Sequence, residues 1–140
     1  MLILGGASAV SSFRLKKLSH DAASWGHQLG GLRAFFFYLA DTSSELSSND
    51  KARLQNLVDG TQESTEDVVA AAGALLVVPR WGTRSPWSTK ASEIANRCSL
   101  SGLRRLERGV AWHFDGMSHD ATARQYLAQL VHDPMIESIA

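Results

Sequence analysis

The segment 78–91, with the sequence VPRWGTRSPWSTKA, is the part of the chain richest in groups that can bind an anion. Its cationic and hydroxyl side chains are Arg80, Thr83, Arg84, Ser85, Ser88 and Lys90. Gly82 lets the backbone approach a ligand, and a helix that begins at Ser85-Pro86 offers N–H groups to an anion. These features are compatible with an anion or phosphate site, but the local pattern favours an ordinary capped helix after a loop. The glycine-lysine spacing of a P-loop is absent, which argues against nucleotide binding by that route.

Several aromatic residues are candidates for stacking on a ligand, among them Trp81, Trp87 and Trp112. Trp81 is expected in a loop and is the best candidate for an exposed contact, whereas Trp87, near a helix start, favours packing. The run Phe35–Tyr38 would alternate between the two faces of a strand, as in sheets that stack on RNA bases. No Lys/Arg-Gly pattern flanks this run, and the net charge is zero. Core packing is therefore the favoured role, and nucleic acid is not an expected partner.

The histidines and the single cysteine give no catalytic or metal-binding pattern. None of the five histidines has the His-x-x-x-His spacing that a helical metal site needs. Surface or helix-capping roles are favoured for all of them: His20, His27, His113, His119 and His132. Cys98 is expected on the apolar face of a helix, as a small buried hydrophobe and not as a nucleophile. We therefore predict neither a catalytic residue nor a metal ligand in this chain.

Length, charge and cysteine content are those of an ordinary single domain. The 140 residues carry 14 basic and 14 acidic side chains, whereas domains that grip a nucleic-acid backbone normally have a basic excess. With 44% hydrophobic residues, the chain can bury a core. One cysteine excludes an internal disulfide framework, and no apolar run reaches the ~18 residues of a membrane span. The first residues do not resemble a signal peptide, so we expect a soluble, cytoplasmic protein without a membrane partner.

The apolar periodicity predicts two strands and two helices in each half of the chain. In the first half these are a strand over 2–4 ended by Gly5 and Gly6, a helix capped by Ser11 or Ser12, a strand over 32–40, and a helix capped by Ser48 with Leu54, Leu57 and Val58 inward. In the second half they are a strand over 74–78, a helix from Ser85-Pro86 with Ala91, Ile94, Ala95 and Cys98 on one face, a strand over 103–114 with a bulge at Gly109, and a helix capped by Ser118.

This order of elements predicts a single α+β domain over 1–140, with an α/β domain as the alternative. It consists of two pseudo-symmetric β-α-β-α halves, about 1–59 and about 73–140, which a linker over about 60–72 joins. Each half alone buries too little apolar surface to be stable, so the halves should pack on each other. We expect the sheets inside and the helices outside.

Four segments of the sequence resemble one enzyme family. They are 3–18 (ILGGASAVSSFRLKKL), 79–91 (PRWGTRSPWSTKA), 105–111 (RLERGVA) and 132–135 (HDPM). In this order they are similar to stretches at the start of long-form phosphoribosylformylglycinamidine synthase, also called formylglycinamide ribonucleotide amidotransferase. Two of the matches are long and specific, and together they span nearly all of the chain.

The resemblance implies the N-terminal, PurS-like domain of a purine-biosynthesis ligase that converts formylglycinamide ribonucleotide to the amidine. The fold would be that of a fused PurS dimer, and the partners would be the synthetase and glutaminase domains of the same enzyme. Those domains would use ATP, Mg and glutamine, so this chain would hold no cofactor and would be inactive alone. The matched positions that would face the substrate cleft, with the ribonucleotide at its edge, are Arg80, Thr83, Ser85, Ser88 and Lys90. The alternatives are a free-standing scaffold and an anion-binding module of the same fold.

Overall fold

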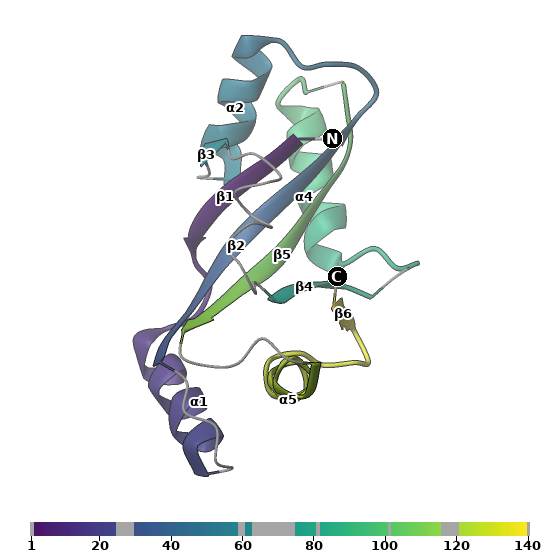
Figure 1. The fold of residues 1–140 in the computed structure, drawn as a ribbon. Coiled ribbons are helices and arrows are strands. Elements are labelled where there is room, and N and C mark those ends of the chain that lie inside the picture. Colours follow the sequence, from purple (N-terminus) through teal and green to yellow (C-terminus); the bar gives the residue numbers. More distant parts are fainter. Residues whose placement is uncertain are drawn as a thin grey trace.

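The computed structural model describes residues 2–24, 30–58, 61–62, 75–80, 82–100, 102–115 and 121–139. Their helices are α1 (Ser12–Ser24), α2 (Ser48–Val58), α4 (Pro86–Arg97) and α5 (Ala121–Val131). Their strands are β1 (Leu2–Ser8), β2 (Gly30–Thr42), β3 (Thr61–Gln62), β4 (Leu75–Pro79), β5 (Leu103–Asp115) and β6 (Glu137–Ile139). Helices and antiparallel strands alternate along the chain (Figure 1), so the predicted α+β class is confirmed.

The strands form one antiparallel sheet in the order β3-β1-β2-β5-β4-β6. The first half of the chain contributes β3, β1 and β2, and the second half contributes β5, β4 and β6 in the reverse spatial order. The long strands β2 and β5 pair at the centre, with Tyr38 opposite Arg108 and Phe36 opposite Val110. The sequence interpretation expected sheets in the plural. The two halves share one continuous sheet instead, because β2 and β5 hydrogen-bond to each other.

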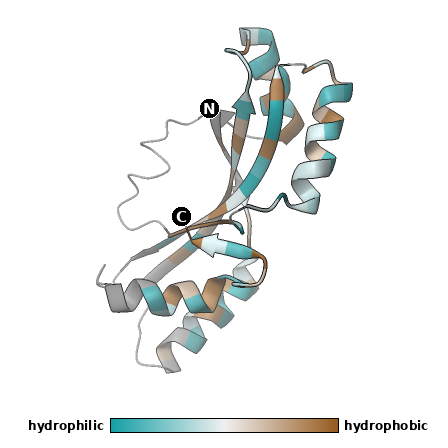
Figure 2. Cartoon of the chain, turned by 90° about the vertical axis from the view of Figure 1, so that its right-hand side faces the viewer, coloured by the Kyte–Doolittle hydropathy of each residue, from teal (hydrophilic) through white to brown (hydrophobic). Residues whose placement is uncertain are grey.

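Both helix pairs cover the same face of this sheet. One buried cluster joins α2 and α4 to the strands through Leu54, Ala95 and Leu106. A second cluster joins α1 and α5 to the strands through Leu18 and Leu127. The β2 residues in the two clusters are Leu32, Ala34, Tyr38 and Ala40, which are all even-numbered and therefore share one face of the strand. The two helix pairs lie at opposite ends of the long strands (Figure 1), and Figure 2 shows the mixture of hydrophobic and hydrophilic positions along these strands.

Most predicted elements are present, and the differences have local causes. Arg14 N–H donates to Ser11 Oγ at 3.3 Å, which confirms a cap at the start of α1. The cap of α2 is Ser47, whose Oγ accepts from Asp50 N–H at 3.2 Å, so the prediction of Ser48 is wrong by one residue. Leu57 is 37% exposed and does not point inward as predicted. The buried position of α2 is Leu54.

Three glycine positions also differ from the prediction. Strand β1 continues through Gly5 and Gly6 to Ser8, because Gly5 pairs with β2 and β3 and Ser8 pairs with β2 beyond an irregularity in the register. Gly109 lies in regular register opposite Phe37, so the predicted bulge is wrong. A Cβ added at Gly109 would overlap the Phe37 ring and would lie 2.8 Å from the Val77 carbonyl oxygen. Gly109 is therefore needed for close packing and not for a kink.

Some predictions fall outside the described residues. They concern His27, most of the segment 60–72, Trp81, Ser118 and His119. Within that segment, Thr61–Gln62 form the short strand β3 beside β1. Among the described residues, no helix is long and apolar enough to cross a membrane.

Candidate functional site

A serine and a proline define the first turn of α4. Ser85 has an extended backbone, with φ −67° and ψ 152°, and its Oγ accepts a hydrogen bond from Ser88 N–H at 3.0 Å. Pro86 follows as the first helical residue and has no N–H to leave unpaired. The predicted start of this helix is therefore confirmed. The cap leaves fewer N–H groups free for an anion than the sequence pattern suggested.

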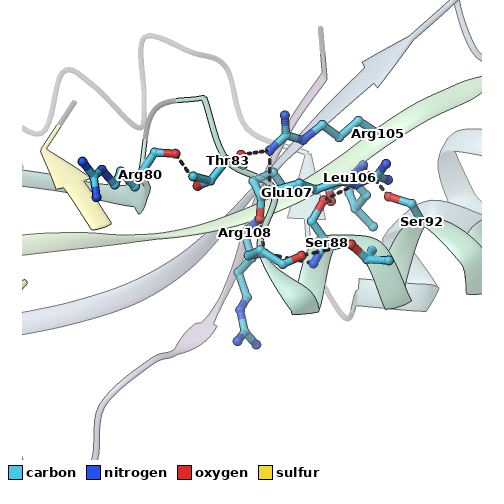
Figure 3. Close-up of polar contacts among 11 residues, drawn as sticks. Arg80, Thr83, Ser88, Ser92, Arg105, Leu106, Glu107 and Arg108 are labelled. Carbon is cyan, nitrogen blue, oxygen red and sulfur yellow. Dashed lines mark hydrogen bonds and ion pairs between the residues drawn. The ribbon is translucent and has the colours of Figure 1, made fainter. Parts of the chain in front are cut away.

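Two buried serines fasten α4 to the backbone of β5 (Figure 3). Ser88 Oγ donates to the Leu106 carbonyl at 2.6 Å, and Ser92 Oγ accepts from the Leu106 N–H at 3.1 Å. Strand β4 pairs with β5 only at residues 110–112, so it does not reach these backbone groups. Because buried backbone groups need partners, the serine hydroxyls take the place of a neighbouring strand.

These serines change which face of α4 is buried. The buried positions are Ser88, Ser92 and Ala95, whereas Ile94 is 41% exposed and Cys98 is exposed. The prediction of Cys98 as a small buried hydrophobe is therefore wrong. It assumed that apolar residues decide the orientation, but the hydrogen bonds to β5 turn the serine side inward.

An ion pair holds the loop before α4 against β5 (Figure 3). Arg105 donates to Glu107 Oε2 at 2.8 Å and to the Thr83 carbonyl at 2.9 Å. Ser85 Oγ donates to Glu107 Oε1 at 2.7 Å, and the Arg108 N–H donates to the same oxygen at 3.2 Å. Burial raises the pKa of Glu107, but these hydrogen bonds together lower it by more, so the pKa lies below its ordinary value. The ionised carboxylate thus connects the loop, the helix start and the strand.

We expect this carboxylate to make folding sensitive to acid. Because the pKa of Glu107 is lower in the folded state, its ionised form stabilises the folded protein. This stabilisation is complete above the unfolded-state pKa of about 4.3, and it is lost as the pH falls through the lower folded-state pKa. Glu107→Gln should reduce the free energy of unfolding at pH 7 by about 1–3 kcal/mol, and the deficit should narrow below pH ~4. Urea unfolding at several pH values measures this. Glu93→Gln, which changes an exposed carboxylate on α4, is the control. An equal deficit for Glu107→Gln at every pH would contradict the assignment.

An open groove of about 550 Å³ lies between the start of α4 and the turn before β6. Phe36 and Val110 line it from the sheet, and Trp87 lines it from α4. Its polar and charged lining residues are Arg80, Thr83, Arg84, Ser85, Arg108 and Glu137. Met135 and Ile136 also line the groove, and they are 74% and 65% exposed. The groove thus combines arginines and hydroxyl groups with an exposed apolar margin.

The structure separates the five residues that were predicted to face a substrate cleft. Arg80, Thr83 and Ser85 line the groove together. Ser88 is fully buried, and its hydroxyl is engaged with β5. Lys90 lines a different cavity of about 290 Å³, which has α2 and α4 residues in its walls. Contact of any of these residues with a substrate stays a prediction.

Sequence reasoning missed Arg108 as a residue of the groove. Its guanidinium carbon lies 4.5 Å from the centroid of the Phe36 ring and 4.8 Å from that of the Trp87 ring. Figure 3 shows its side chain leaving β5 in the opposite direction from that of Arg105. The alternation of a strand, applied to the Arg-Leu-Glu-Arg run, already places Arg108 on the face of Leu106 and away from Glu107. No sequence signal indicates which aromatic rings contact this side chain.

The remaining candidates do not assemble a reactive centre within the described part of the chain. These residues include no group of three His, Cys, Asp or Glu side chains that could hold a metal ion. His113 packs against Phe35 with ring centroids 6.0 Å apart, and His132 Nδ1 contacts the Ala128 carbonyl. Trp112 is buried in the core, at 3% exposure. What the arrangement offers chemically is a place for an anion.

The part of the chain that carries the groove matches a known family. The family described as "Formylglycinamide ribonucleotide amidotransferase N-terminal" matches residues 35–140. The matched region includes the loop before α4, the groove arginines and the Arg105–Glu107 pair. It covers most of the chain and agrees with the resemblance that the sequence motifs indicate.

Proposed function

Because the chain belongs to the family of formylglycinamide ribonucleotide amidotransferase N-terminal domains, we propose that it acts as a non-catalytic part of this purine-biosynthesis ligase. Its role is to assemble with the synthetase and glutaminase domains and to form one wall of the substrate cleft. The observation that carries this proposal is the arginine-lined groove beside the loop before α4, which lies inside the matched region.

The strand order supports a PurS-dimer-like architecture. Each half contributes a long strand to the centre, a second strand beside it and a short strand at the edge. Strand β1 corresponds to β4, β2 to β5 and β3 to β6. With these strands exchanged, the sheet has the same strand order when it is read from the opposite edge. Two copies of a β-α-β-α unit joined through β2 and β5 account for this arrangement.

We propose that Arg80 and Thr83 form part of the cleft wall, and that Ser85, Ser88 and Lys90 have other roles. Arg80 and Thr83 line the groove and are exposed, so they face the ribonucleotide directly. Ser85 and Ser88 position the loop through their bonds to Glu107 and Leu106. Lys90 lies on a separate cavity, where it meets a neighbouring domain. ATP, Mg and glutamine would be used by the other domains of the enzyme.

Association with the rest of the enzyme tests this proposal. The chain is mixed with the synthetase and glutaminase part of a family enzyme that lacks its own N-terminal domain, and sedimentation velocity measures complex formation. We expect a stable complex, and no glutamine- or ATP-dependent amidation by the chain alone. Failure to form any complex under conditions where the native N-terminal domain does so would refute the assembly role. Turnover by the chain alone would refute the non-catalytic role.

A second candidate function is a free-standing anion-binding module of the same fold. The charge of the groove favours it, because three arginines and one carboxylate line the wall among the described residues. Such a module would bind an anion but would not associate with the synthetase part. The same sedimentation experiment therefore separates the two functions.

A further inference from the structure

The groove between α4 and β6 concentrates positive charge in a protein that is neutral overall. Among the described residues, Arg80, Arg84 and Arg108 line it, and Glu137 is the one carboxylate in its wall. Glu137 Oε1 accepts a hydrogen bond from the Asp133 N–H at 2.9 Å, so this carboxylate is engaged with backbone. Among the described residues, no carboxylate pairs with any of the three guanidinium groups. The groove therefore carries cationic charge that a ligand can neutralise.

Arg108 is the residue best placed to hold such a ligand. Its guanidinium lies within 4.8 Å of the ring centroids of both Phe36 and Trp87, and these cation–π contacts restrict its motion. Stacking uses the faces of the planar group and leaves its N–H edges available as donors. Since an ordered arginine loses less freedom on binding, it binds an anion at a smaller cost in entropy.

Two further features of the groove fit a phosphate ester. Arg80 and Arg84 come from the loop before α4, so three guanidinium groups approach the groove from two elements. Arg84 Nε is 3.4 Å from Ser88 Oγ, which directs this side chain along the start of the helix. A cavity of about 550 Å³ is within the size range of small-molecule sites.

We propose that this groove is a binding site for the phosphate group of a small phosphate ester, with Arg108 as its central ligand. The inference rests on the proposed function in choosing a ribose phosphate over other anions. It goes beyond that function by assigning the site to Arg108 and to the groove between α4 and β6. The margin formed by Met135 and Ile136 covers the uncharged part of the ester.

Titration of the 140-residue chain followed by NMR amide shifts tests the site. The probes are inorganic phosphate, ribose 5-phosphate and, for ionic strength, potassium chloride. We expect saturable shifts at Gly82, Thr83 and Gly109 with both phosphates, with ribose 5-phosphate bound at least as tightly as inorganic phosphate. Potassium chloride should not reproduce them. Shifts that never saturate, or that potassium chloride reproduces, would overturn the proposal.

Substitutions assign the site to particular arginines. Arg108→Ala should weaken ribose 5-phosphate binding by about 10–100-fold, the loss expected for charge-assisted hydrogen bonds. Arg80→Gln changes an exposed side chain, so it tests the groove without a risk to folding and should also weaken binding. Arg97→Gln is the matched control, because Arg97 lies at the far end of α4 and pairs with Glu93. Unchanged affinity in folded Arg108→Ala or in Arg80→Gln would refute the assignment.

These outcomes are separable from those of the proposed function. A chain that joins the synthetase part but binds no phosphate would overturn this inference and leave the assembly role intact. A chain that binds phosphate through Arg108 but forms no complex would refute the assembly role and leave the phosphate site intact.

Discussion

Gly109→Ala should lower the free energy of unfolding by about 3 kcal/mol, the upper end of the usual cost of overpacking. A methyl group at this position would overlap the Phe37 ring, with Cε1 at 2.6 Å, and would lie 2.8 Å from the Val77 carbonyl oxygen. The ring is 4% exposed and has little space to move, and the carbonyl belongs to the neighbouring strand. Relief therefore requires β4 and β5 to move apart, which weakens their pairing.

Urea unfolding of Gly109→Ala beside Gly102→Ala measures this effect. A methyl group at Gly102 would lie 3.2 Å from Leu46 Cδ2, the end of a flexible side chain, so its cost should stay below about 1 kcal/mol. Similar losses in the two variants would show that Gly109 is not needed for close packing. Phe37→Leu should couple favourably with Gly109→Ala, because a smaller side chain removes one of the two overlaps.

Leu106→Ala should cost about 2–5 kcal/mol, because it opens a cavity where α2, α4 and the sheet meet. Leu106 is fully buried in the cluster that contains Leu54 and Ala95. Its backbone also carries the hydrogen bonds to Ser88 and Ser92. Relaxation around the missing side chain would therefore shift the start of α4 and the loop that lines the groove.

Leu57→Ala is the matched control for this substitution. It removes the same atoms from a side chain that is 37% exposed, so we expect a loss below about 1 kcal/mol. Thermal unfolding monitored by circular dichroism compares the two variants with the parent chain. A loss for Leu106→Ala no greater than that for Leu57→Ala would contradict the placement of this core.

Local sequence signals predicted much of the fold, but they did not predict how elements meet. Ser85-Pro86 gave the start of α4 because capping and the missing proline N–H act within one turn. The burial of Ser88 and Ser92 was not predictable from helix periodicity, since it depends on where β4 stops pairing with β5. Gly109 illustrates the same limit, because the Phe37 ring that excludes a side chain comes from a distant strand.

The candidate site divides in the same way. The segment 78–91 directed attention to Arg80, Thr83 and Ser85, and these three do share a groove. The sequence did not show that Lys90 lies apart from these three residues. Lys90 follows four helical residues, and its position on α4 places it at a different cavity. The place of Arg108 in the groove could not be predicted locally. It depends on the pairing of β2 with β5, which brings Phe36 beside the Arg108 side chain.

Reconstitution of amidation tests the assembly role most directly. A family synthetase and glutaminase part without its N-terminal domain is assayed for glutamine-dependent conversion of formylglycinamide ribonucleotide, with and without this chain. We predict that the chain restores turnover and that neither component is active alone. The native N-terminal domain serves as the positive control. No gain in turnover with the folded chain, while the native domain restores activity, would contradict the account.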